Sequence, residues 1–130
     1  MKIVKQREEN DCLKCSLAMV LGLPYEEAPG LDMRLPLKRR LNKFHRDLKV
    51  AGYEMVSVSR RPKKGIITYH LYYNHENYQD YHHARPIIKG REYEVNHDRQ
   101  YTDKLIREFK SVVIPKGGEF HSNFYKVKKI

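Results

Sequence analysis

The spacing of apolar residues changes at Gly52, and this change constrains the fold more than any other feature of the chain. Before it, two stretches follow the 3.6-residue period of helices: one starts near Cys12 and ends at Gly22, and the other starts at Pro36. After Gly52 the period is two, and "YEMVSVS" and "GIITYHLYY" are typical of strands joined by the turn "RRPKK". Helices followed by strands predict an α+β fold, and the short connections favour antiparallel pairing.

Each predicted helix has one apolar face. The first helix presents Leu13, Leu17, Val20 and Leu21, and the second presents Leu37, Leu41, Phe44, Leu48 and Ala51. Asn10 and Asp11 are suitable caps for the first helix. Further along, Thr102 could cap a short helix, and "SVVIP" and "FYKVKKI" would complete the sheet.

Length and composition indicate one domain over residues 1–130. The chain has 130 residues, of which 40% are apolar, with ten tyrosines, and this composition is that of a folded chain. It has no apolar run of about 18 residues, and "MKIVKQREEND" lacks the apolar stretch of a secretory signal. We therefore expect a cytoplasmic protein without a membrane segment.

The net charge of +10 predicts attraction to phosphates and acidic surfaces. Acidic residues are interspersed among the basic ones, and the sequence carries no signature of a known RNA-binding module. The basic face of the second helix is therefore either a solvated surface or a docking site for an acidic protein or nucleic acid.

A hairpin is predicted around Lys89-Gly90 in "HARPIIKGREYEVN". A two-residue turn there pairs positions whose numbers sum to 179. This register gathers Ala84, Pro86, Ile88, Tyr93 and Val95 on one apolar face and sets Arg85 opposite Glu94. It also sets His83 directly opposite Asn96, at about 5 Å between Cβ atoms, with Asp98 the next residue on that face and His82 pointing the other way.

Cys12 is expected in the first turn of its helix. There the sulfur lies near unpaired backbone N–H groups and the positive end of the helix dipole, which favour the thiolate. A thiolate nucleophile also needs a histidine that holds the ion pair and protonates the leaving group, and hydrogen-bond donors for the oxyanion.

The segment "QREENDCLKCSLAMVLGLPYEEAP" resembles the papain-like cysteine peptidases, especially the short bacterial and phage branch related to bacteriocin-leader-processing peptidases. The resemblance implies a papain-like α+β fold, with the Cys-bearing helix packed on an antiparallel β-sheet, and acyl transfer from a peptide or protein substrate without a cofactor. It implies that Cys12 is the nucleophile and that Gln6, with the Cys12 N–H, binds the oxyanion. It implies His83 as acid and base, oriented by Asn96 or Asp98.

Two other functions stay open. The scaffold could be catalytically inactive and phage-encoded, binding an acidic host protein or nucleic acid through its basic surface. Alternatively, the "CLKC" pair could hold zinc together with histidines such as His82, His83 or His97. We expect Cys15 to be a core residue, and His121 is a second candidate for the catalytic base.

Overall fold

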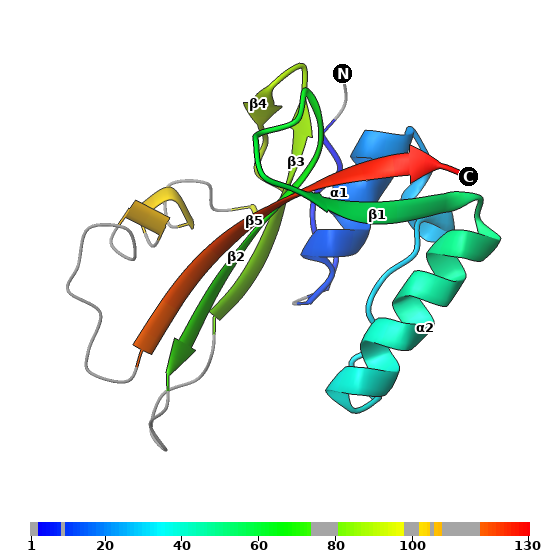
Figure 1. The fold of residues 1–130 in the computed structure, drawn as a ribbon, viewed down its shortest axis with the longest axis horizontal. Coiled ribbons are helices and arrows are strands. Elements are labelled where there is room, and N and C mark those ends of the chain that lie inside the picture. Colours follow the sequence, from blue (N-terminus) through cyan, green and yellow to red (C-terminus); the bar gives the residue numbers. More distant parts are fainter. Residues whose placement is uncertain (1–2, 9, 74–80, 98–101, 105, 108–117) are drawn as a thin grey trace.

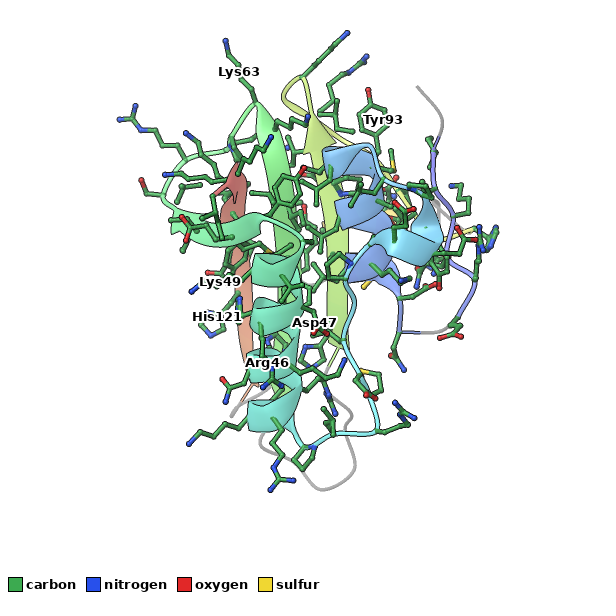
Figure 2. All side chains as sticks on the ribbon, turned by 90° about the vertical axis from the view of Figure 1, so that its right-hand side faces the viewer. Arg46, Asp47, Lys49, Lys63, Tyr93 and His121 are labelled. Atoms are coloured by element: carbon green, nitrogen blue, oxygen red, sulfur yellow. The ribbon has the colours of Figure 1, made fainter. Side chains whose placement is uncertain are left out.

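Two helices pack on one face of a five-stranded antiparallel sheet, as Figure 1 shows and as Figure 2 shows from the side. This computed structural model describes residues 3–8, 10–73, 81–97, 102–104, 106–107 and 118–130. The helices are α1 (Cys12–Leu21), the 3-10 helix η1 (Tyr25–Glu27) and α2 (Leu37–Val50). The strands are β1 (Tyr53–Val58), β2 (Lys64–Tyr73), β3 (Tyr81–Ile88), β4 (Arg91–Glu92) and β5 (Gly118–Lys129). The prediction of an α+β fold with an antiparallel sheet is confirmed.

Helix α1 begins and ends where the sequence predicts. Gly22 ends it in the left-handed conformation, with φ of 67°. The predicted role of Asp11 as a side-chain cap is wrong. Asp11 holds the N-cap position, but its carboxylate accepts hydrogen bonds from the backbone N–H groups of Arg7 and Glu8 and from the Tyr25 hydroxyl. The carboxylate therefore closes the loop before α1 and does not cap the helix.

Helix α2 uses only half of its apolar face. Phe44 and Leu48 are buried, whereas Leu37 is 62% exposed and Leu41 is 42% exposed. Pro36 stands at the N-cap, one position before the first turn in which it was expected. In Figure 1 the first turns of α2 diverge from the strands, and so Leu37 and Leu41 have less of the core to cover.

The strand order in the sheet is β1-β5-β2-β3-β4. The short "RRPKK" connection predicted that β1 and β2 would be neighbours, and this prediction is wrong. Strand β5 lies between them. The second half of β5 pairs with β1, and most of β5, from its start, pairs with β2. Of the two segments expected to complete the sheet, "FYKVKKI" does so as part of β5, and "SVVIP" lies outside the described residues.

The β3-β4 hairpin has the predicted turn and register. Lys89 and Gly90 have φ values of 53° and 77°, as a type I′ turn requires. Ile88 pairs with Arg91 and Ile87 pairs with Glu92, so the residue numbers of each pair sum to 179, as predicted. The Tyr93 N–H donates to the Pro86 carbonyl in the same register. The paired strand β4 ends at Glu92, and the chain beyond it leaves the sheet ladder.

The sheet has an apolar cluster on each face. The helices cover the larger cluster, whose buried residues are Leu17, Ala18, Val20, Ala28, Phe44, Leu48, Ile66 and Ala84. On the other face Ile67, Tyr69 and Ile87 pack with Ile106, which belongs to the helical residues 102–104 and 106–107. Thr102, predicted as a cap, is itself helical and buried. Among the described residues, no helix is long and apolar enough to cross a membrane.

Candidate active site

His83 lies in β3 on the same sheet face as Tyr69, its direct partner in β2. The β3-β4 ladder ends before it, and so His83 lies near the open edge of the sheet. Its side chain is nevertheless only 6% exposed. A buried imidazole needs hydrogen-bond partners for its ring nitrogens, and two neighbours provide them.

The first partner is Cys12. The side chains of Cys12 and His83 form a hydrogen bond, which joins the first residue of α1 to β3. Helix α1 packs along β3, so the contact follows from the packing of two elements that are more than 60 residues apart in sequence. Cys12 remains partly exposed and can be reached from solvent. The expected pairing of this thiol with a histidine of the hairpin is therefore present.

The second partner is Glu94. His83 Nε2 lies 2.7 Å from Glu94 Oε1 and 2.9 Å from Oε2. Because Nε2 is engaged by this carboxylate, Nδ1 is the ring nitrogen that remains for the sulfur of Cys12. The three side chains thus form a chain of sulfur, imidazole and carboxylate, the order that a cysteine nucleophile requires.

A buried arginine holds Glu94 in place. Arg85 Nε donates to Glu94 Oε2 at 2.7 Å, and its other nitrogens reach Glu92, Thr102 and Asp103. The Glu94 side chain is 1% exposed and that of Arg85 is 8% exposed. Burial by itself raises the pKa of Glu94, but the hydrogen bonds and positive charges of His83 and Arg85 outweigh it and lower that pKa. Glu94 is therefore an ionised carboxylate against the imidazole.

The same contacts set the protonation of His83. Burial would lower the pKa of His83, but the hydrogen bonds to Cys12 and Glu94 and the charge of Glu94 raise it to about 9. The imidazole is consequently protonated at neutral pH, with one N–H directed at Glu94 and the other available to Cys12.

Glu94 takes the place that the sequence assigned to Asn96. The register was right, but the ladder does not extend to residue 96, and the longer Glu94 side chain reaches His83 diagonally from the next position on the same face. The backbone carbonyl of Asn96 accepts a hydrogen bond from Lys5 Nζ at 3.2 Å. The alternative orienting residue, Asp98, lies outside the described residues.

Gln6 lies beside the start of α1. Its backbone N–H donates to the Val95 carbonyl at 2.8 Å, and its carbonyl accepts from His97 Nε2 at 2.8 Å. Its side-chain Nε2 donates to the Glu8 carbonyl at 3.4 Å. Binding of an oxyanion by this amide would take Nε2 away from Glu8.

Cys15 is a core residue, as predicted, with no exposed surface. Burial first, and then the charge of Asp11, raise the pKa of Cys15 to about 12. The histidines proposed to complete a zinc site have other partners: His82 contacts His70, His83 contacts Glu94, and His97 contacts Gln6. Within the described ranges, no group of three or more His, Cys, Asp or Glu side chains is arranged to hold a metal ion.

Comparison with known proteins adds no relative, since no family model, curated protein or solved structure matches the chain. The function must therefore be argued from the site itself. Sequence reasoning identified Cys12 and His83 but missed the roles of Glu94 and Arg85 in the site. The signal for both was present in the register, which set Arg85 opposite Glu94 on the face of His83.

Proposed function

We propose that this chain is a papain-like cysteine enzyme that transfers the acyl group of a peptide or isopeptide bond. The observation that supports it best is the hydrogen bond between Cys12, at the start of α1, and His83, a buried imidazole whose Nε2 is bound to Glu94. Both cysteines are free thiols, as a nucleophile of this class must be. A reducing compartment preserves that state, and we therefore place the enzyme in the cytoplasm of a bacterial or phage-infected cell.

In the first step the Cys12 sulfur attacks the carbonyl carbon of the substrate. The carbonyl oxygen becomes an oxyanion, which the Cys12 backbone N–H and the amide of Gln6 would bind after that amide turns from Glu8. His83 then gives its proton to the leaving amine, and the tetrahedral intermediate collapses to a thioester on Cys12.

In the second step His83, now neutral, takes a proton from water or from an acceptor amine. The activated oxygen or nitrogen attacks the thioester carbonyl, and Cys12 leaves as a thiolate beside the reprotonated imidazole. Glu94 keeps the imidazole oriented through both steps and stabilises its positive charge. Arg85 acts through Glu94 and is a positioning residue.

Alkylation of the intact protein by iodoacetamide at pH 6 tests the proposal. We expect Cys12 to react faster than free cysteine, because the imidazolium of His83 stabilises its thiolate. Cys12→Ala should abolish labelling, whereas Cys15→Ala should retain it, because Cys15 is buried and holds its proton. His83→Gln should slow the reaction to the rate of an ordinary thiol. A reaction at pH 6 no faster than that of free cysteine would contradict the proposal.

A second candidate function is binding of nucleic acid through a basic hollow at the β1-β2 connection. The hollow has a volume of about 500 Å³ and is lined by Val58, Ser59, Arg60, Arg61, Pro62, Lys63, Lys64 and Lys126. Five of these residues are cationic and none is acidic, and only Arg61 has a described acidic partner, Glu92 at 2.6 Å. Concave positive charge of this kind attracts phosphodiester groups.

Binding of a single-stranded oligonucleotide at several salt concentrations tests this second function. We expect Lys63→Ala together with Lys126→Ala to weaken binding and to reduce its salt dependence. Lys49→Ala is the matched control because Lys49 lies on α2, away from Lys63, as Figure 2 shows. An equal loss in the control would indicate diffuse attraction to the basic chain and would contradict a site in the hollow.

A further inference from the structure

The site contains a second thiol that the proposed peptidase chemistry does not use. Cys12 and Cys15 stand three positions apart at the start of α1, so they are neighbours on one side of the helix. Cys12 is partly exposed and Cys15 is completely buried beneath it. One sulfur can therefore meet a reagent from solvent, while the other can meet only Cys12 or its buried surroundings.

Asp11 lies close to Cys15 at the start of the helix. The Cys15 N–H donates to the Asp11 carbonyl at 2.9 Å, and the charge of the Asp11 carboxylate adds to burial in raising the pKa of the Cys15 thiol. Asp11 is itself 6% exposed and is held by Arg7, Glu8 and Tyr25. Cys15 is therefore held as a thiol, protected from solvent, within the first turn that also carries Cys12.

The geometry of the first helical turn allows the two sulfurs to join. Residues at i and i+3 of a helix have Cβ atoms about 5–6 Å apart, and a disulfide needs about 3.5–4.5 Å. The turn must therefore tighten by roughly 1 Å. Cys12 is the first helical residue, and its N–H makes no intrahelical hydrogen bond, so the first turn can tighten without breaking one at Cys12.

We propose that Cys12 and Cys15 are a redox pair in which Cys12 is the oxidisable thiol and Cys15 resolves it as a reversible disulfide. The proposal rests on the proposed function in that it uses the same activated sulfur of Cys12. The oxidant is a hydroperoxide. The Cys12 thiolate attacks the peroxide oxygen to give a sulfenic acid and hydroxide, or an alkoxide from an organic hydroperoxide.

The buried thiol then completes the reaction. The Cys15 sulfur attacks the sulfenic sulfur of Cys12 while its proton passes to the departing hydroxyl. A sulfur–sulfur bond forms, the sulfur–oxygen bond breaks, and the hydroxyl leaves as water with the proton of the Cys15 thiol. Two thiols are oxidised and one hydroperoxide is reduced.

The disulfide protects the enzyme and switches it off. It engages the sulfur that His83 contacts, so the nucleophile is lost until a thiol reductant restores it. Without Cys15, the sulfenic acid of Cys12 would oxidise further to sulfinic and sulfonic acids, which simple thiols do not reverse. We therefore expect peroxide to inhibit the native chain reversibly and to inhibit a chain without Cys15 irreversibly.

Intact mass measured after treatment with hydrogen peroxide tests the inference on the native chain. We expect a loss of two hydrogen atoms, reversed by dithiothreitol, and a Cys12–Cys15 crosslink in the peptide map. Cys15→Ala and Cys15→Ser should instead gain two or three oxygen atoms at Cys12 and should not recover.

The outcomes separate this inference from the peptidase proposal. A native chain that gains oxygen at Cys12 without forming the crosslink overturns the redox pair, even if iodoacetamide labelling at pH 6 is fast. A crosslink that forms in a chain whose labelling is slow overturns the activated thiolate but not the pairing of the two sulfurs. Because the main measurement uses the native chain, it does not depend on the folding of any variant.

Discussion

Glu94 lies between the His83 imidazole and the Arg85 guanidinium, at 2.7 Å from a nitrogen of each. The alternation of the hairpin predicted that these three residues share a face, and the structure agrees. It could not predict which residue reaches His83, because that depends on where the ladder ends and on the length of the side chain. Glu94, a diagonal neighbour with a longer side chain, is the residue whose carboxylate reaches His83.

Replacing Glu94 by Gln tests the role of its charge. Glu94→Gln should lower the pKa of His83, because the hydrogen bond and charge of the carboxylate help to raise it. The rate of Cys12 alkylation at neutral pH should fall by roughly tenfold or more. The imidazole pKa can be measured by NMR titration. Glu92→Gln is the matched control, because Glu92 binds Arg61, Tyr69 and Arg85 but has no described contact with His83. Equal effects of the two variants would contradict the role of Glu94.

Stability should depend on pH through His83. Its pKa is about 9 in the folded chain and about 6.5 in the unfolded chain, so folding takes up a proton between these values. The stabilisation is complete below pH 6.5 and is lost as the pH rises through 9. The free energy of unfolding, measured with urea, should fall over this interval by at most roughly 2–4 kcal/mol, because a proton that Cys12 gives up to His83 in the folded chain cancels part of the uptake.

His83→Gln is the control for that pH dependence, because its amide matches the size of the ring but does not titrate. The variant should lose most of the change between pH 6.5 and 9. An unchanged pH profile would show that other groups, such as lysines and tyrosines, cause the dependence.

Strand β5 determines how the elements combine. The boundaries of α1, α2 and the β3-β4 hairpin followed from local signals, namely apolar period, Gly22 and the Lys89-Gly90 turn. The position of β5 between β1 and β2 did not follow from local signals. A short connection favours neighbouring strands, and nothing in the sequence of β1 or β2 indicates that a third strand lies between them. Pairing between distant segments depends on the complementarity of whole strands.

At Gly65 the backbone of β2 lies so close to β5 and to Pro62 that no side chain fits. A Cβ built at Gly65 would collide with the backbone carbonyl of Tyr125 in β5 and with the Pro62 ring. Gly65→Ala should therefore lower the free energy of unfolding by about 1–3 kcal/mol, as overpacking does. Ser122→Ala, an exposed position of β5, should change it by less than about 0.5 kcal/mol. Equal urea midpoints for both variants would contradict this close approach.

At the scale of the whole molecule, the two faces of the sheet differ in charge. The helices cover the apolar face of Ile66 and Ala84, and the opposite face carries His83 and Arg85 beside a smaller apolar cluster. The candidate site is formed where α1 meets the edge of this sheet. The register of the hairpin predicted that His83 and Arg85 share a face. It could not predict that Arg85, Glu92 and Asp103 would form one ionic network, because Asp103 comes from a separate segment.

The interior position of β5, between β1 and β2, makes the whole fold depend on residues 118–130. Removing them should unfold the chain, because β1 would lose its pairing partner and β2 would lose one of its two. Circular dichroism and urea unfolding measure this loss. Deleting Ile130 alone is the control, since it costs one backbone hydrogen bond to Gly52. A cooperative transition in the truncated chain would contradict the dependence on β5.

The same strand order has a consequence for the newly made protein. Ribosomes synthesise Cys12 early and β5 last among the described elements, so a growing chain carries its nucleophile long before the sheet can close. Pairing between such distant segments is slow and leaves strand edges uncovered. We therefore expect the Cys12 thiol of a growing chain to react as an ordinary thiol until β5 has been made and has paired.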